Sequence, residues 1–230
     1  MILGSKRLLI VGGTSSLAHT LIGVAKHESY EITATVRGNL GNFEDSQTKW
    51  INLNLSNKYS IENFLVDLSD TQFDRVIFLI GATTNKEFLE ISYDEILQYY
   101  TTYAVNSLYL LQKSLPYLKD TANILVMSSR SGSKPSYDVH YSAVKSALEA
   151  FVRSSAKKLA KNQSIVAISS GLIKGSRMYL DMKPEHRILH EVRAGGSLIT
   201  VEEICAQIWC LNPKETIENS GQTIHLGPIY

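Results

Sequence analysis

The sequence predicts a doubly wound α/β sandwich of about seven mostly parallel strands with helices on both faces. Short apolar runs alternate with segments of helical periodicity along the whole chain. Several runs, such as residues 8–11 and 76–80, are apolar at consecutive positions, which indicates strands that are buried on both faces. A chain of 230 residues, of which 44% are hydrophobic, can bury one such core without a disulfide or a structural metal.

Seven strands and five helices follow from this pattern. The strands are expected over residues 8–11, 32–36, 50–53, 76–80, 124–127, 165–168 and 223–226. The helices are expected over residues 16–26, 59–68, 94–118, 139–160 and 201–211. Such alternation is typical of helical crossovers between parallel strands and predicts a single domain over residues 1–230. Residues 176–197 lack a clear pattern and follow the sixth strand. Because open α/β sheets bind ligands beyond the carboxyl ends of their strands, we expect this segment to form a substrate lid; the alternative is a surface loop without a role.

The charge balance and the cysteines exclude several classes of protein. Lys and Arg number 23 and Asp and Glu 22, so the net charge is +1 and no surface for nucleic acid is expected. The apolar runs are far shorter than the roughly 20 residues of a membrane helix, and the first residues do not resemble a secretion signal.

Cys205 and Cys210 fit no metal spacing, and His186 and His190 lack further ligands, so we expect no metal site. The low cysteine content suits a reducing compartment, and we expect a cytoplasmic location.

A glycine-containing turn directly follows the first strand and opens the first helix. Gly13 lies in this turn, and Thr14, Ser15 and Ser16 add hydroxyl donors to the backbone N–H groups at the helix start. Because these N–H groups lie at the positive end of the helix dipole, the arrangement favours a diphosphate. The turn therefore predicts a dinucleotide site, although many similar turns bind nothing.

Arg37 bears on the choice of dinucleotide. It stands at the end of the second strand, 24 residues after Gly13, where a nucleotide-binding fold meets the adenine ribose. An acidic residue at this place binds the ribose 2′-hydroxyl, whereas an arginine favours a 2′-phosphate. Arg37 therefore predicts NADP(H) in preference to NAD(H); the alternative is a solvated arginine at a strand end.

A phenol and an ammonium group lie four residues apart at Tyr141 and Lys145 and so share one helical face. A nearby cation favours the phenolate, so we expect the pKa of Tyr141 to fall from about 10 toward the working pH, which suits proton transfer to a carbonyl. The spacing alone is not specific, because Tyr–Lys pairs also occur at positions 109/113 and 179/183. Tyr141 is distinguished by Ser129, twelve residues upstream at the end of the fifth strand, whose hydroxyl can hold a substrate oxygen.

The glycine turn, Asn106 in the long middle helix, Ser129 and the Tyr141-x-x-x-Lys145 pair together resemble the short-chain dehydrogenase/reductase family over nearly the whole chain. The resemblance implies a Rossmann-like NAD(P)-binding domain. It also implies that Tyr141 is the acid/base and that Ser129 orients the substrate, with Ser128 as the alternative. By the same resemblance, Lys145 binds the nicotinamide ribose and lowers the pKa of the tyrosine, and Asn106 holds a water of the proton relay.

The chain departs from the family pattern at the cofactor end. The family's turn carries three glycines, and Leu17 and His19 occupy the second and third positions, so Leu17 must point away or the cofactor must shift. Gly81 alone remains of the family's Asn-Asn-Ala-Gly segment, and Asn54 replaces an aspartate that meets the adenine amine. Gly171 matches the glycine of the family's Pro-Gly pair after the sixth strand. The resemblance places Leu17, Asn54, Gly81 and Gly171 at the cofactor.

The expected function is that of an NADP(H)-dependent oxidoreductase of the ketoreductase type, which interconverts a small-molecule carbonyl and a secondary alcohol. Because helices of this family pair subunits, the resemblance also implies a homodimer or homotetramer. The alternative is a catalytically inactive member that binds nucleotide as a regulatory or assembly protein, which Leu17 and His19 favour. The lid side chains expected near the substrate are Arg177, Met178, Tyr179, Met182, His186 and Arg187.

Overall fold

The computed structural model describes residues 5–39, 46–69 and 71–227, in which seven strands form one sheet. All neighbouring strands are parallel, in the order β3-β2-β1-β4-β5-β6-β7. The strands are β1 (Arg7–Val11), β2 (Glu31–Val36), β3 (Thr48–Asn52), β4 (Phe73–Phe78), β5 (Leu118–Met127), β6 (Ser164–Ser170) and β7 (Thr223–Leu226). The predicted doubly wound α/β fold is confirmed.

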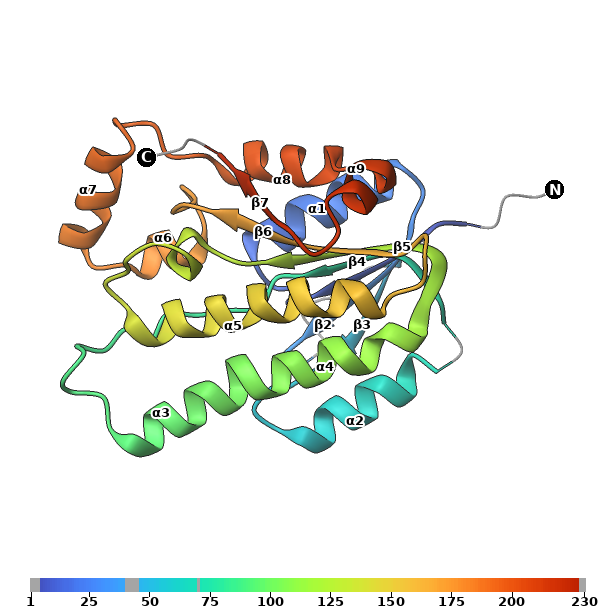
Figure 1. Ribbon diagram of the computed structural model, residues 1–230, viewed down its shortest axis with the longest axis horizontal. Helices are drawn as coiled ribbons and strands as arrows, with labels where there is room; N and C mark the ends of the chain where they lie inside the picture. Colours follow the sequence, from blue (N-terminus) through green and yellow to red (C-terminus); the bar gives the residue numbers. More distant parts are fainter. Residues whose placement is uncertain (1–4, 40–45, 70, 228–230) are drawn as a thin grey trace.

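Helices cover both faces of this sheet (Figure 1). One face carries α1, α8 and α9, and the other carries α2, α4 and α5, while α6 and α7 lie at one end of the molecule. The helices are α1 (Ser16–His27), α2 (Lys58–Asp67), α3 (Tyr93–Tyr100), α4 (Asn106–Ser114), α5 (Val139–Ser155), α6 (Arg177–Asp181), α7 (Pro184–Arg193), α8 (Val201–Cys210) and α9 (Pro213–Glu218). No helix in the described part of the chain is both long and apolar enough to span a membrane.

Each face of the sheet buries its own apolar core. On one face, Phe64 of α2, Leu110 of α4 and Leu148 of α5 pack against the strands. On the other face, Leu21 of α1 and Ile204 of α8 do so. The inner strands β1, β4 and β6 are therefore buried on both sides, which explains their consecutive apolar residues.

The order of the strands reverses between β1 and β4. From β1 the chain winds outward through β2 and β3, and from β4 it winds the other way through β5, β6 and β7. The loops that follow β1 and β4 therefore diverge and leave a crevice at the carboxyl ends of these strands, the usual place for a ligand in such a sheet.

The long helix predicted over residues 94–118 is divided and shorter. A π-helical turn at Thr101–Val105 separates α3 from α4. A 3₁₀ turn with Pro116 follows Ser114, and β5 already begins at Leu118. Proline has no N–H to continue an α-helix, which accounts for the early end.

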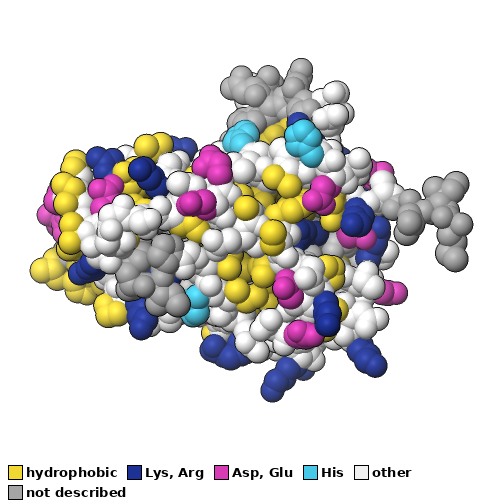
Figure 2. All heavy atoms as spheres, turned by 90° about the horizontal axis from the view of Figure 1, so that it is seen from above, with side chains coloured by type: hydrophobic (Ala, Val, Ile, Leu, Met, Phe, Trp, Pro, Cys, Tyr) yellow, Lys and Arg dark blue, Asp and Glu magenta, His cyan; other side chains and the backbone are white. Residues whose placement is uncertain are grey.

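Residues 176–197, for which the sequence showed no clear pattern, contain the two short helices α6 and α7. Ser176 caps α6, and Pro184 occupies the first turn of α7. Three buried apolar residues anchor the segment, and these are Leu172, Met182 and Leu198. Ile188 and Val192 of α7 are exposed, and Figure 2 shows hydrophobic side chains gathered at the end of the molecule where α7 lies.

Candidate active site

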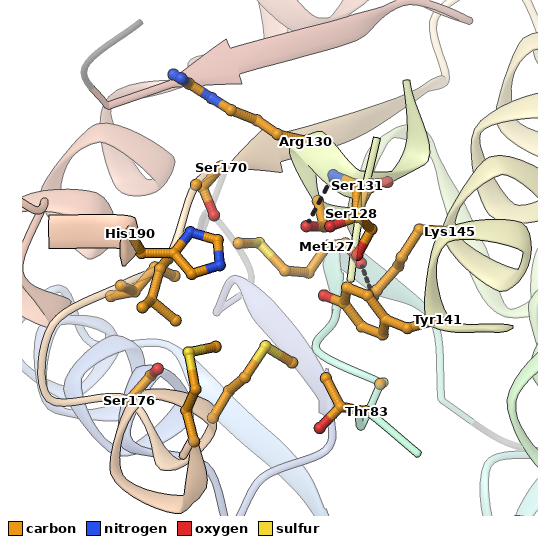
Figure 3. Close-up of a pocket in the computed structure, with 18 of the residues that line it drawn as sticks. Thr83, Met127, Ser128, Arg130, Ser131, Tyr141, Lys145, Ser170, Ser176 and His190 are labelled. Atoms are coloured by element: carbon orange, nitrogen blue, oxygen red, sulfur yellow. Dashed lines mark hydrogen bonds between the residues drawn. The ribbon is translucent and has the colours of Figure 1, made fainter. Parts of the chain in front are cut away.

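A cavity of about 680 Å³ opens at the carboxyl ends of the strands, where the loops after β1, β4, β5 and β6 converge. Its wall includes the start of α1, the start of α5 and parts of the segment 176–197. Figure 3 shows Tyr141 of α5 and His190 of α7 directed into the cavity from opposite sides. The cavity thus lies at the crevice that the strand order creates.

The start of α1 forms one end of the cavity. Ser15 is the N-cap, and its hydroxyl accepts a hydrogen bond from the Ala18 N–H at 3.1 Å. Ser15, Ser16 and Leu17 all line the cavity. The Ser16 hydroxyl is buried and has no hydrogen-bond partner among the described residues. A buried donor without a partner at the positive end of a helix fits an anionic ligand such as a diphosphate.

The two glycines of this turn are required by close packing. Gly12 has a φ of +92°, and a Cβ atom there would lie 2.8 Å from the carbonyl oxygen of Leu79. Gly13 donates its N–H to the Thr35 carbonyl, and its Cβ atom would lie 2.7 Å from that oxygen and 2.8 Å from the Trp50 ring. Both glycines let the turn lie against neighbouring strands.

The residues at the family's other glycine positions point mainly elsewhere. Leu17 is only 7% exposed and packs into the core with α8, while an edge of it reaches the cavity. His19 is exposed on α1 and does not line the cavity. Thr14 is exposed in the turn. The leucine is therefore accommodated by the core between α1 and α8.

The residues predicted for the adenosine end lie outside the cavity. Arg37 is exposed just after β2. The side-chain carbonyl of Asn54 accepts hydrogen bonds from the N–H and the hydroxyl of Ser56, at 3.1 and 2.7 Å. That oxygen is thus engaged within its own loop. In contrast, Gly81 and Gly171, after β4 and β6, line the cavity as expected of residues near a ligand.

Ser128 and Ser129 follow β5, but their hydroxyls have different partners. Ser128 is 3% exposed and donates to Glu149 at 2.6 Å. Ser129 accepts a hydrogen bond from the Ser131 N–H at 3.2 Å, and its side chain also bonds to Tyr141. Ser129 is therefore the serine whose hydroxyl lies beside the phenol.

Asp138 fixes the start of α5 and thereby the position of Tyr141. Its carboxylate accepts hydrogen bonds from the Tyr141 N–H at 2.9 Å and from the N–H and hydroxyl of Thr84 at 2.6 and 2.9 Å. The cap thus joins α5 to the loop after β4. Tyr141 is 7% exposed, in the first turn of the helix. Sequence reasoning missed Asp138, although an aspartate directly before the first residue of a helix is an N-cap signal.

Lys145 lies one turn further along α5 and connects the ends of two strands. Its amine donates to the carbonyls of Ile80 and Met127, at 2.8 and 2.7 Å. Figure 3 shows Lys145 beside Tyr141 and Met127. A Cβ atom at Gly81 would lie 2.8 Å from this amine, so the glycine makes room for it. The amine is 5.6 Å from the centroid of the Tyr141 ring. The expected Ser129, Tyr141 and Lys145 are therefore brought together.

Burial is the main cause of the pKa shifts of Tyr141 and Lys145. It raises the pKa of Tyr141 to about 12, while the hydrogen bond with Ser129 acts in the opposite direction. It lowers the pKa of Lys145 to about 8, partly offset by Glu149. The predicted fall in the pKa of Tyr141 is wrong, because the cost of burying a phenolate outweighs the attraction of an amine whose own charge is disfavoured by burial. Tyr141 therefore keeps its proton at neutral pH.

Asn106 does not join the group through its side chain. Its amide donates to the carbonyl of Leu55 at 2.6 Å, and it does not line the cavity. It directly follows the π-helical turn Thr101–Val105. The side chain therefore connects the middle helix to the loop after β3.

Part of the predicted lid contributes to the cavity. Arg177, Met178 and Met182 line it, as expected, whereas Tyr179, His186 and Arg187 do not. The Tyr179 hydroxyl instead donates to Glu191 at 2.7 Å. His190 and Arg193 also line the cavity. They lie on α7, which the sequence did not reveal as a helix, so their direction was not evident.

Metal ligands do not gather within the described ranges, where no group of three or more His, Cys, Asp or Glu side chains is placed to hold an ion. The donors that face the cavity are mainly hydroxyls, backbone groups and basic side chains. This donor set suits organic and anionic ligands.

Comparison with known proteins gives one family match and many structural matches. The family model described as "Enoyl-(Acyl carrier protein) reductase" matches residues 25–226. No curated protein matches the chain in sequence. A short chain dehydrogenase family protein from Francisella tularensis aligns with a TM-score of 0.83 at 16% identity, over 96% of this chain and 97% of that one.

Two further structures were solved with a cofactor. BdcA in complex with NADPH aligns with a TM-score of 0.83 at 16% identity, over 96% of this chain and 92% of that one. A 4-hydroxyisoleucine dehydrogenase complexed with NADH aligns with a TM-score of 0.84 at 20% identity, over 96% and 97% of the two chains. At such identities these matches establish the fold.

Proposed function

The chain belongs to the short-chain dehydrogenase/reductase family of oxidoreductases, and we propose that it reduces a small-molecule ketone to a secondary alcohol with NADPH. The observation that carries the proposal is the group formed by Ser129, Tyr141 and Lys145 in a cavity that also reaches the start of α1. This arrangement offers a proton donor and an anion site within one enclosure.

The protonated phenol supports reduction as the working direction. Because the pKa of Tyr141 is about 12, the group is an acid at neutral pH and can give its proton to a carbonyl oxygen as negative charge develops there. Ser129, bonded to the same phenol, can donate to that oxygen and hold it in place. The proton that Tyr141 loses is replaced from solvent through the open cavity.

Lys145 has a positioning role and an electrostatic role in this proposal. Its two bonds to the carbonyls of Ile80 and Met127 hold the ends of β4 and β5 together beneath the phenol. When the amine is charged, it stabilises the phenolate that remains after proton transfer. Asn106 is proposed to support a proton relay through its backbone, since its side chain is bonded to Leu55.

The residues present fit a nicotinamide dinucleotide. Ser15 and the unpartnered Ser16 hydroxyl would hold the diphosphate at the start of α1. Gly81 and Gly171 leave space along the cavity wall for the nicotinamide end. When bound, the cofactor supplies the hydride that reduces the carbonyl carbon.

NADPH is proposed over NADH because of Arg37. Its exposed guanidinium at the end of β2 is available to a 2′-phosphate, and no carboxylate precedes it at Val36. We expect Arg37→Asp to weaken NADPH binding about tenfold or more while NADH binding changes little, as measured by titration of cofactor fluorescence. Equal affinities of the native chain for both cofactors would contradict this preference.

The main test compares Tyr141→Phe with the native chain. A panel of ketones is screened for NADPH oxidation, and turnover of the best substrate is expected to fall by about 10²- to 10⁴-fold in the variant. NADPH affinity is expected to stay within about threefold, because the phenol ring and its packing remain. Unchanged turnover would refute the role of Tyr141.

A second candidate is a nucleotide-binding regulatory or assembly protein, which the side chain of Leu17 at a glycine position favours. The two functions differ in their measurements. A regulator binds NADPH but does not oxidise it with any ketone, whereas the reductase oxidises it with at least one. Failure to bind NADPH at millimolar concentration would exclude the reductase.

The assembly and location remain part of the proposal. Tyr93, Leu97 and Val105 on α3 and the following turn are exposed, which supports a homodimer or homotetramer through the middle helices. Light scattering coupled to size-exclusion chromatography measures the assembly directly. Cys205 and Cys210 are free thiols, which supports a cytoplasmic location.

A further inference from the structure

The part of the cavity away from α1 is lined by basic residues without acidic ones. Arg130, Lys134, Arg177 and Arg193 contribute to the wall, and His190 lies among them. No Asp or Glu occurs in the lining drawn from the described residues. The chain as a whole is nearly balanced, at a net charge of +1. The positive character is therefore a local property of this cavity.

Two of these basic side chains, Lys134 and Arg193, have no acidic partner in the described part of the chain. Arg177 pairs with Asp181 at 3.2 Å, and Arg130 donates to the Gly227 carbonyl at 3.5 Å. No ion pair involves Lys134 or Arg193 within the same residues. Lys134 and Arg193 are exposed at the rim and so keep their charge available to a ligand.

Three carboxylates on the elements around the cavity are engaged by hydroxyl and N–H donors. Asp138 accepts three hydrogen bonds from Thr84 and Tyr141, and Glu149 accepts one from Ser128. Glu191 of α7 accepts from Tyr179. These acids therefore serve local structure and form no ion pair with Lys134 or Arg193.

The lowered pKa of His190 is consistent with positive charge around it. Burial lowers its pKa, and Arg193 and His186 lower it further. The ring is directed into the cavity opposite Tyr141 (Figure 3). At neutral pH it is a neutral hydrogen-bond donor beside an arginine, which suits an anionic group on a ligand.

The middle of the cavity is apolar and adaptable. Met127, Met178 and Met182 line it, and these are three of the four methionines in the chain. Leu172 adds to this surface. Methionine side chains adjust to ligands of different shape, so the region between Tyr141 and α7 suits a hydrocarbon body.

We infer that the substrate of the proposed reduction is an acidic ketone, with an apolar body along the methionines and an anionic group held by Lys134 and Arg193. The inference rests on the proposed function and adds the chemical class of its substrate. The ketone oxygen lies at Ser129 and Tyr141, and the carboxylate or phosphate lies near His190 at the rim. Reduction adds one hydride and one proton at the carbonyl and leaves the anionic group unchanged.

The test uses straight-chain oxo acids of increasing length, their methyl esters, and phosphorylated ketones of similar length. The native enzyme with NADPH is expected to reduce at least one anionic ketone with a kcat/KM about tenfold or more above its uncharged counterpart. The acid and phosphate series distinguish the two anionic groups. Added salt is expected to lower kcat/KM for the anion more than for the ester, because it screens charges at the rim.

Variants that remove one positive charge test whether Lys134 and Arg193 cause the preference for the anionic ketone. Arg193→Gln and Lys134→Gln are each expected to raise KM for the anion about tenfold relative to the ester, and the double variant more. Arg153→Gln is the matched control, since Arg153 is exposed near the end of α5 and lies outside the cavity. NADPH affinity is measured on every variant.

Any one of four outcomes overturns the inference. One is a kcat/KM for the methyl ester that equals the kcat/KM for its acid. Another is a rise in KM in the Gln variants that is as large for the ester as for the acid. The third is a loss of NADPH affinity in the Gln variants that accounts for the whole change in KM. Lys134 and Arg193 would then bind the cofactor and not the substrate. Binding is also measured without turnover, as the thermal shift caused by each acid at saturating NADPH. If neither an oxo acid nor a phosphorylated ketone binds, the inference fails, whereas the proposed reduction is judged separately by NADPH binding and Tyr141→Phe.

Discussion

The turn after β1 and the segment from Ser129 to Lys145 lie on the same cavity but are held by different forces. Steric packing determines the turn, because Gly12 and Gly13 lie against backbone carbonyls of neighbouring segments and Leu17 fills the core beneath α8. Its shape therefore depends on volume and close approach more than on particular polar atoms.

Hydrogen bonds hold the other segment. The hydroxyls of Ser142 and Ser146 donate to the carbonyls of Ser131 and Gly132, each at 2.6 Å. Together with the bonds of Asp138 and Lys145, they join α5 to the loops after β4 and β5. Each bond requires a donor of defined length and direction, so this segment tolerates fewer residue types.

The contrast explains where the chain departs from its family. The departures at Leu17 and His19 lie in the first turn of α1, where the core accepts the leucine and the histidine is exposed. The full set of Ser129, Tyr141 and Lys145 lies where substitution removes a specific bond. A departure in a packing-determined turn is therefore weaker evidence of lost activity than one in the hydrogen-bonded segment would be.

Among the changes that test this contrast, the largest effect is expected from Lys145→Met. The variant lacks the amine beneath the phenol, so turnover is expected to fall about 10²- to 10³-fold in the NADPH oxidation assay. Native turnover is expected to decline as the pH rises through about 8, because Lys145 loses its charge there, and the variant should lack this step. Activity within tenfold of native would show that the hydrogen-bonded segment does not need its lysine.

The same residue makes a stability prediction with a defined sign. The pKa of Lys145 is about 8 in the folded chain, against 10.5 for an ordinary lysine, so the unfolded chain binds more protons between these values. The contribution of this group to stability therefore rises as the pH increases from about 8 to 10.5. Melting temperatures across this range should rise less, or fall more, in Lys145→Met than in the native chain.

Gly13→Ala tests the packing of the turn. The added Cβ atom would lie 2.7 Å from the Thr35 oxygen and 2.8 Å from the Trp50 ring, so the strands must move. We expect a loss of about 3 kcal/mol in the free energy of unfolding and a melting temperature lower by roughly 6–12 °C. Gly23→Ala is the matched control in α1, where nothing lies within 4 Å. It is expected to stabilise by about 0.5–1 kcal/mol. Equal effects of the two changes would contradict the packing argument.

Much of the fold is predictable from sequence because consecutive apolar residues mark strands that are buried on both faces. The errors occur where polar residues continue an element. β5 extends back to Leu118 through Lys119 and Asp120, and β3 begins at Thr48 rather than at residue 50. The helices α6 and α7 are short and amphipathic, and they are stabilised by a small cluster of distant residues.

The candidate site is predictable in its residue types but not in its electrostatics. The spacing of Tyr141 and Lys145 places them on one face of a helix, and the structure agrees. The direction of the tyrosine's pKa shift depends on burial, which no local spacing reveals. The same holds for Arg193 and His190, whose role depends on how α7 lies over the cavity.

Leu17→Ala tests whether the leucine serves the core or obstructs the cofactor. Because the side chain is 7% exposed and packs between α1 and α8, truncation is expected to cost about 2–3 kcal/mol in the free energy of unfolding, measured by urea titration. NADPH affinity is expected to stay within about threefold. A tenfold gain in affinity would show that the leucine blocks the site, and the turn would then be a true functional departure.

The smallest effect is expected from the double change Ser142→Ala/Ser146→Ala. It leaves the carbonyls of Ser131 and Gly132 without these donors, so the loop that carries Ser129 is held less firmly against α5. Each lost bond contributes about 1 kcal/mol, and the melting temperature is expected to fall by roughly 4–8 °C. Turnover should fall about three- to tenfold with NADPH affinity unchanged, because the α1 turn does not depend on these bonds. Loss of NADPH affinity in parallel with turnover would show that the two regions are coupled, and the distinction between a packed turn and a hydrogen-bonded catalytic segment would fail.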